Sequence, residues 1–198
     1  MPQSACPSEL VPQCQERTPA FELSFSCFQH MPLLTNDQWN GMLSAGIERA
    51  IERHDFGLVA FVFMPEHVHL LVTQRRPAES IPRLLYMMKR TFSHWVKQEL
   101  HMSEHPLLRQ LTIREKPGRY IFRFWEPGPG RIRALASPAA LIAAIDTIHA
   151  NPVRRGLCDA PDQWRWSSWR QHHLPTQPPD RDLLRIRAPS ASAGFRRR

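Results

Sequence analysis

The sequence predicts an α+β fold of the ferredoxin-like type, an antiparallel sheet with helices packed on one face. Apolar and polar residues alternate over 21–28 (FELSFSCF), which is typical of a half-buried strand. Two apolar runs, 57–64 and 67–73, are separated only by Pro65-Glu66 and indicate strands joined at a sharp corner. Helical spacing follows the first and third runs, so the predicted order is strand, helix, strand, strand, helix, strand, helix.

The first helix is expected to begin at Thr35 and to end near His54. Thr35 and Gln38 are three residues apart, which is the spacing of a capping box. The apolar residues that follow share one helix face, and they are Trp39, Met42, Leu43, Gly46, Ile47, Ala50 and Ile51. This stripe predicts a helix that packs on the sheet.

The second helix is longer and is expected from about Ser80 to Leu100. Its predicted buried face consists of Ile81, Leu84, Leu85, Met88, Phe92, Trp95 and Val96. Residues 101–118 have no regular pattern and are expected to be irregular.

The last strand and the last helix follow. Residues 120–125 resemble a short strand, and the glycines and prolines of 126–130 predict a turn after it. Ser137 before Pro138 is typical of a helix start, and this helix is expected to run to about Ala150.

A chain of 198 residues suits one compact domain with terminal extensions. Residues 1–19 contain prolines and polar residues without periodicity and predict a disordered leader. The domain is expected over 20–170, and the prolines and arginines of 171–198 predict a flexible basic tail.

The composition favours a polyanionic partner. The formal net charge is +8 and the pI is about 10.2, which favours nucleic acid first and an acidic membrane surface second. No apolar run approaches the ~20 residues that cross a bilayer. The scattered cysteines predict neither a disulfide framework nor a thiolate zinc site, so a cytoplasmic location is expected. These cysteines are Cys6, Cys14, Cys27 and Cys158.

His67 and His69 are the most informative residues of the sequence. Residues two apart on a strand point to the same face, so both imidazoles are expected side by side. Burying two titratable rings costs more than burying two valines. Two histidines in the core and a pair of metal ligands are both compatible with this pattern.

Asn151 is a candidate third ligand at the end of the last predicted helix. Thr147 and Asn151 are four residues apart and share a helix face, at a separation of about 6 Å. One amide oxygen and two imidazoles would form a mixed site for Mg²⁺ or Mn²⁺, with positions left open for a phosphate oxygen. The alternative is that Asn151 only caps the helix before a proline.

Four separated motifs carry a family resemblance that spans roughly residues 21–169. Their ordered occurrence resembles the single-tyrosine His-hydrophobic-His (HUH) transposases, and the REP-associated tyrosine transposases in particular. The motifs are MPEHVHLLV (64–72), RFWE (123–126), IDTIHANPVRRGL (145–157) and WRWSS (164–168).

The resemblance implies a metal-dependent nuclease and strand transferase that acts on single-stranded, hairpin-forming DNA as a homodimer. In this family a tyrosine oxygen attacks the scissile phosphate, which forms a 5′-phosphotyrosine bond and releases a free 3′-hydroxyl. By matching positions, His67, His69 and Asn151 would bind Mg²⁺ or Mn²⁺.

The chain departs from the family at the nucleophile, because Thr147 occupies the position of the family's tyrosine. The threonine hydroxyl is far less acidic than a phenol with a pKa of ~10, and its side chain is shorter. Tyr86 and Tyr120 are the two tyrosines of the sequence. Tyr86 is expected to pack, and nothing in the sequence places Tyr120 at the metal as a substitute nucleophile.

Three functions therefore remain open. The protein could nick single-stranded DNA, with water as an alternative nucleophile. It could instead bind folded DNA or RNA as a catalytically dead relic, or retain the fold without a selected activity. Metal-ligand candidates favour binding, whereas Thr147 argues against strand transfer.

Basic residues on the second helix, in the loop 131–133 and after Asn151 are candidate phosphate contacts, although solvated helix faces carry such charges as well. The candidates are Arg83, Lys89, Arg90, Arg131, Arg133, Arg154 and Arg155. The tryptophans Trp125, Trp166 and Trp169 could stack on bases, but a core role is favoured for them.

Overall fold

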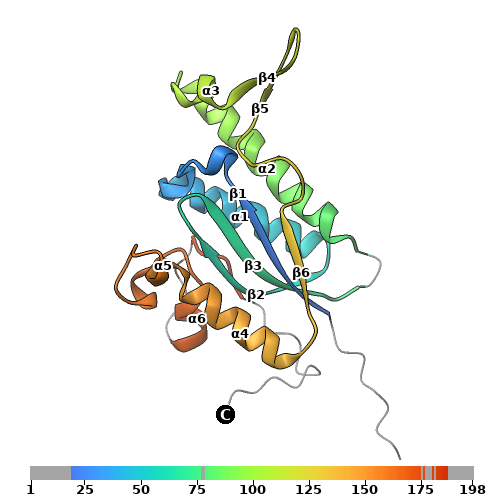
Figure 1. Ribbon diagram of the computed structural model, residues 1–198, viewed down its shortest axis with the longest axis vertical. Coiled ribbons are helices and arrows are strands. Elements are labelled where there is room, and N and C mark those ends of the chain that lie inside the picture. Colours follow the sequence, from blue (N-terminus) through green and yellow to red (C-terminus); the bar gives the residue numbers. More distant parts are fainter. Residues whose placement is uncertain (1–18, 77–78, 175, 177–179, 181, 187–198) are drawn as a thin grey trace, which may run out of the picture.

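The computed structural model describes residues 19–76, 79–174, 176, 180 and 182–186 (Figure 1). The strands are β1 (Ala20–Ser26), β2 (Phe56–Phe63), β3 (His67–Gln74), β4 (Thr112–Lys116), β5 (Arg119–Phe122) and β6 (Arg131–Leu135). The helices are α1 (Asp37–Arg53), α2 (Ile81–Met102), α3 (Leu107–Gln110), α4 (Pro138–His149), α5 (Asn151–Arg154) and α6 (Trp169–His173). Within these residues, no helix is long and apolar enough to cross a membrane.

The main sheet has four antiparallel strands in the order β2-β3-β1-β6. The strand that carries His67 and His69 is therefore an inner strand, as the sequence predicts. Ser26 lies opposite His67, and Ser24 lies opposite His69. The two histidines consequently share one sheet face with small polar neighbours.

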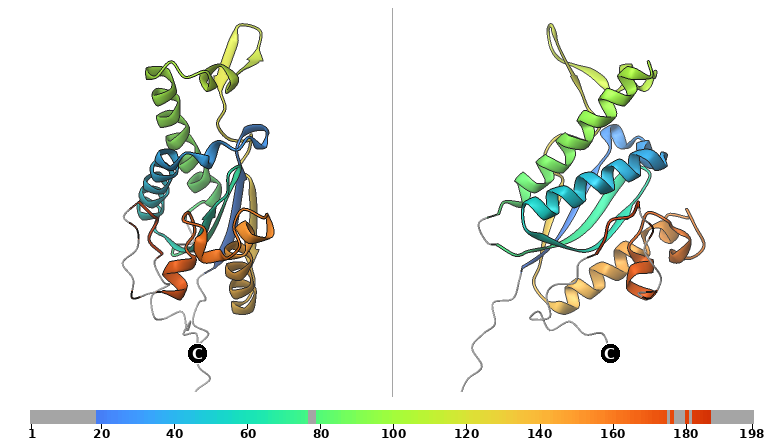
Figure 2. Two further views of the ribbon diagram at one scale, coloured as in Figure 1. Left: turned by 90° about the vertical axis from the view of Figure 1, so that its left-hand side faces the viewer. Right: turned by 180° about the vertical axis from the view of Figure 1, so that it is seen from behind.

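Helices cover both faces of this sheet (Figure 2). The helices α1 and α2 pack on one face over Val68, Leu70 and Val72, as expected. Helix α4 packs on the other face, where Leu71 of β3 joins a second and smaller apolar cluster. The predicted α+β class with an antiparallel sheet is confirmed, and α4 adds a layer beyond the predicted single face.

The fourth strand of the sheet is β6, where the sequence predicts a loop over 131–133. β6 is an edge strand, and residues 131–134 are exposed, so it lacks the apolar alternation that marks a buried strand. The predicted strand over 120–125 is β5, but it pairs with β4 in a separate hairpin. This hairpin projects beside α3 at one end of the molecule (Figure 1).

The first helix is capped one residue later than predicted. The side chain of Asn36 accepts a hydrogen bond from the backbone N–H of Trp39 at 3.2 Å. Thr35 belongs to a 3-10 turn, and its hydroxyl donates to the carbonyl of Pro32. The predicted starts of α2 at Ser80 and of α4 at Ser137 are confirmed, since both side chains accept capping hydrogen bonds.

The predicted flexible tail begins too early, because part of residues 171–198 packs on the domain. Leu183 and Leu184 are buried in the cluster formed with α1 and α2. Arg165 holds the same segment through Asp180 and Asp182 and also reaches Asp37 of α1. Of the leader predicted over 1–19, only residue 19 is among the described residues. The end of the predicted tail, 187–198, also lies outside them.

Gly130 allows β6 to lie close to β1. Its φ is +89°, and an added Cβ would clash with the backbone carbonyl oxygen of Ser24. Gly128 has a similar φ of +84° but open space around it.

We expect Gly130→Ala to lower the free energy of unfolding by about 3 kcal/mol, because a backbone clash adds to the conformational strain. Gly128→Ala should cost only about 1 kcal/mol, from conformation alone. Urea unfolding of both variants measures the difference, and equal losses would contradict the close approach of the two strands.

Candidate metal centre

His67 and His69 lie side by side on the face of the sheet that α4 covers. They alternate along β3 with Val68 and Leu70, which are buried on the opposite face. The two rings meet edge to face, with centroids 4.8 Å apart. Both side chains are mostly buried, with 13% and 20% of their surfaces exposed.

Glu66 orients the ring of His67. The Nδ1 of His67 lies 3.2 Å from the Oε1 of Glu66, and Arg155 donates to the same oxygen at 2.6 Å. A carboxylate accepts hydrogen bonds only, so Nδ1 carries the proton and Nε2 keeps its lone pair. This is the arrangement in which a metal-binding histidine is held by an outer carboxylate.

Glu22 takes a corresponding position at His69. Its Oε1 is 3.7 Å from Nδ1 of His69, beyond hydrogen-bond distance, and Arg133 donates to its other oxygen from Nε at 2.8 Å. Among the described residues, Nδ1 of His69 is buried without a hydrogen-bond partner. Each histidine of the pair therefore has one carboxylate beside it, and each carboxylate has one arginine.

Asn151 contacts His67 from the segment that follows the C-terminal end of α4. Its Nδ2 lies 3.4 Å from Nε2 of His67. The backbone stays in the helical region at Ala150, so Asn151 continues the course of α4 into α5. Thr147, one turn earlier, is exposed, and its carbonyl accepts a hydrogen bond from Arg154 at 2.9 Å. The amide of Asn151 is thus at the histidine pair rather than acting only as a helix cap.

The side chains present fit a divalent ion held by few protein ligands. In the described part of the chain, no group of three or more His, Cys, Asp or Glu side chains could hold a metal. A metal site here would therefore use the two imidazoles and the oxygen of Asn151, which faces His67 when the amide is turned over. The lone pair on Nε2 of His67, which faces Asn151, fits this arrangement.

Burial keeps both histidines neutral, which is the form that binds metals. Desolvation, together with the neighbouring His67, lowers the pKa of His69 to about 4 against the opposing effect of Glu22. Desolvation also lowers the pKa of His67 against the opposing effect of Glu66. Arg131 and Arg154 act on His69 in the same direction as burial.

The stability of the metal-free protein should fall as the pH drops from about 6.5 toward 4. In this window the unfolded chain protonates His69 and the folded chain does not, so the stabilisation is complete above pH 6.5 and is lost below it. The slope for one such group is at most about 1.4 kcal/mol per pH unit. Urea unfolding at several pH values should show a shallower decline in His69→Gln, and identical declines would contradict a neutral buried His69.

The predicted basic residues separate into two groups. Four of them surround the histidine pair, from β6 and from the segment at and after α5: Arg131, Arg133, Arg154 and Arg155. The other three, Arg83, Lys89 and Arg90, lie on α2, which packs on the opposite face of the sheet. Positive charge near the histidines therefore comes from the first group.

The tyrosines lie elsewhere in the molecule. Tyr86 is 55% exposed, so the prediction that it packs is wrong, and Tyr120 on β5 is 65% exposed. Both line a cleft between α2 and residues 120–129, whose lining includes none of His67, His69 and Asn151. Trp125 and Trp166 follow the favoured interpretation, since both are buried in the core, whereas Trp169 is half-buried and stacks on His173.

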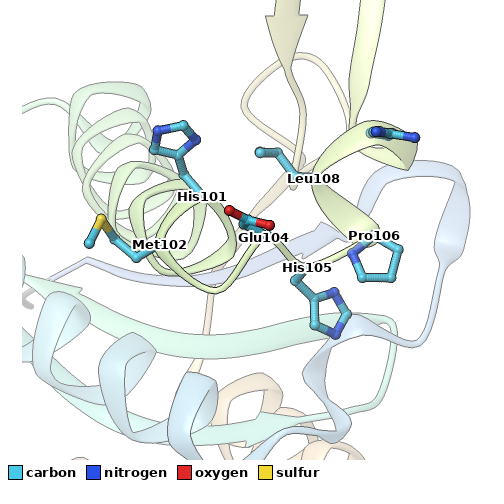
Figure 3. Close-up of a pocket in the computed structure, with 7 residues that line it drawn as sticks. His101, Met102, Glu104, His105, Pro106 and Leu108 are labelled. Carbon is cyan, nitrogen blue, oxygen red and sulfur yellow. The ribbon is translucent and has the colours of Figure 1, made fainter.

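A second hollow, of about 710 Å³, lies at the end of α2 and contains His101, Glu104 and His105 (Figure 3). The two imidazoles point in different directions from the chain, and neither faces the other (Figure 3). This hollow therefore holds titratable groups without assembling them into a site.

The carboxylates of Glu22 and Glu66 were not among the predicted site residues. Glu66 stands directly before His67 in the sequence, so its proximity could have been inferred. Glu22 becomes a neighbour of His69 only through the pairing of β1 with β3, which the sequence does not specify.

Comparison with known proteins places the fold. Residues 24–111 match the family model described as "Transposase IS200 like", a span that contains His67 and His69 but ends before Thr147 and Asn151. A search of curated proteins found no match.

Among solved structures, a REP-associated tyrosine transposase bound to a REP hairpin is similar, with a TM-score of 0.62 and 17% identity over 96% of this chain and 98% of that one. A candidate transposase of Deinococcus radiodurans aligns with a TM-score of 0.43 and 19% identity over 75% of this chain and 97% of that one. The first similarity shows a shared fold.

Proposed function

We propose that this chain, whose residues 24–111 match the IS200-like transposase model, is a member of that family, binds hairpin-forming single-stranded DNA beside His67 and His69, and holds Mg²⁺ or Mn²⁺ there. The observation that carries the proposal is the contact of Asn151 with His67, beside His69, where two neutral imidazoles with a carboxylate next to each lie at an arginine-rich surface. The similar transposase was solved with a REP hairpin, which supports DNA as the partner.

Three side chains would hold the ion and two would orient them. His67, His69 and Asn151 supply the donors, while the carboxylate of Glu66 orients the ring of His67 and that of Glu22 lies beside His69. A bound divalent ion polarises a phosphate oxygen and stabilises the charge that develops on the leaving oxygen.

The arginines around the pair would position the DNA strand. Arg131 and Arg154 lie close enough to lower the pKa of His69 by their charge. Contacts of this kind bind phosphates and set the path of a strand without reading its sequence. Arg133 and Arg155 are engaged by Glu22 and Glu66, so their first effect is on the carboxylates.

Strand transfer is proposed to be impaired, because Thr147 stands where the family has its tyrosine. Its hydroxyl is a weak acid, and the corresponding alkoxide is a poor leaving group in the return step. Tyr120 is exposed in a different cleft, which does not favour it as a replacement nucleophile. Metal-assisted attack by water would leave a nuclease without a covalent intermediate.

The second candidate function is DNA binding without cleavage. It is favoured because both tyrosines of the chain line a cleft that includes none of the metal-ligand candidates His67, His69 and Asn151. We also infer a homodimer from the family resemblance and a cytoplasmic location from the scattered cysteines. Light scattering of the purified protein measures the first.

We expect Arg131→Gln and Arg154→Gln each to weaken binding of a hairpin-forming single strand and to lower the salt slope of log Kd by about 0.7. The matched control is Arg53→Gln at the end of α1, on the opposite layer of the molecule, which should leave the slope unchanged. Fluorescence anisotropy across a salt series measures all three. Equal slopes in every variant would contradict the proposed DNA surface.

A further inference from the structure

A cleft of about 840 Å³ lies between α2 and residues 120–129, and the proposed DNA surface does not use it. One wall is a stripe along α2 that runs from Pro82 to Lys97 at helical spacing. The other wall begins at β5, whose hairpin stands beside the second half of α2 (Figure 1). The cleft therefore belongs to the face of the sheet opposite His67 and His69.

Both tyrosines of the chain line this one cleft. Tyr86 comes from α2 and Tyr120 from β5, and they are 55% and 65% exposed. Nη1 of Arg90 donates to the hydroxyl of Tyr86 at 2.9 Å, and its guanidinium lies 5.8 Å from the ring centroid. This contact holds the ring of Tyr86 in place. Covering the two exposed aromatic rings with a ligand would be favourable, because large aromatic surfaces gain free energy on burial.

Cations accompany the aromatic rings. Lys89, Arg90, Lys97 and Arg123 line the cleft, against the single carboxylate of Glu126. Lys89 donates to the carbonyls of Glu126 and Gly128 at 2.8 and 2.7 Å, so it ties the far wall to α2. A cleft with this balance attracts a polyanion.

An unused hydrogen-bond donor lies in the same lining. Trp125 is only 5% exposed, and its Nε1 is buried without a hydrogen-bond partner in the described part of the chain. Buried donors are nearly always paired in folded proteins, so an unpaired indole N–H in a residue of the cleft wall is unusual.

We propose that this cleft binds a segment of single-stranded nucleic acid, with bases stacked on Tyr86 and Tyr120 and phosphates near Lys97 and Arg123. Exposed rings interleaved with cations are the chemistry that single strands require, because every base has a flat face to stack. A duplex hides these faces, and an acidic peptide has charge but no rings to match. The proposal rests on the proposed function only in taking nucleic acid as the ligand.

The test uses the full chain and a labelled decathymidylate in fluorescence anisotropy. We expect Tyr120→Ala to weaken binding roughly tenfold, which is the effect of losing one stacked base. Tyr120→Phe keeps the ring and should bind within about twofold of the parent. A decathymidylate that contains 4-thiothymidine should form photo-crosslinks to Tyr86 or Tyr120 in peptides identified by mass spectrometry.

Three outcomes would overturn the cleft. The first is an unchanged affinity of Tyr120→Ala for the decathymidylate, and the second is crosslinks confined to β6 and α5. The third is displacement of the strand by deca-glutamate at equal charge, because this would show attraction by charge without stacking. If these occur while Arg131→Gln and Arg154→Gln still weaken hairpin binding, the proposed function stands and only the cleft proposal fails.

Discussion

Replacing His67 by alanine is expected to lower the affinity for Mn²⁺ by at least about 100-fold. Nε2 of this side chain faces Asn151, and the carboxylate of Glu66 at Nδ1 sets the tautomer of the ring. Removal of an outer carboxylate alone typically costs 10- to 100-fold in metal affinity, and loss of a direct ligand costs more. Isothermal titration calorimetry with Mn²⁺ measures the change.

Graded controls accompany this variant. Glu66→Gln should lie between the parent and His67→Ala, because it removes only the group that orients the ring. His101→Ala removes an imidazole at the far end of α2 and should bind Mn²⁺ as the parent does. Equal affinities of His67→Ala and the parent would contradict the proposed ligand set.

Replacing Thr147 by tyrosine is expected to create a protein that attaches covalently to single-stranded DNA in the presence of Mn²⁺. Thr147 is exposed and lies one helical turn before Asn151, so a phenol there extends along the same helix face toward the histidine pair. A phenol is a far stronger acid than the threonine hydroxyl, which makes its oxygen a competent nucleophile. The adduct appears as a band of raised mass on a denaturing protein gel.

Two further variants serve as controls for this result. Thr147→Phe has the size of tyrosine without the oxygen and should form no adduct. His67→Ala combined with Thr147→Tyr should lose the adduct, since the nucleophile then acts without the metal site. An adduct in the phenylalanine variant, or none with tyrosine, would contradict the assignment of position 147.

The central strand of the site could be predicted because its pattern is local. Alternation along β3 places His67 and His69 on one face and Val68 and Leu70 on the other, whatever strands flank it. Helix spacing likewise places Thr147 and Asn151 on one face. The starts of α2 and α4 follow from serine caps that need no tertiary contact.

Features that depend on pairing between distant segments could not be predicted. β6 is an exposed edge strand, and its arginines show no apolar alternation. Its pairing with β1 brings Arg133 to Glu22, and the pairing of β1 with β3 brings Glu22 to His69. The helix period alone predicts that Tyr86 packs, whereas in the structure it is exposed in a cleft lined by α2 and residues 120–129.

The most direct measurement compares native and denaturing gels of the parent protein with a labelled hairpin-forming single strand and Mn²⁺. If the chain keeps its metal and DNA site but has lost the family nucleophile, the native gel retains the DNA and the denaturing gel shows no protein–DNA adduct. A covalent adduct of the parent protein that disappears in His67→Ala would contradict this, because it would show that a nucleophile other than a tyrosine at position 147 works at the metal site.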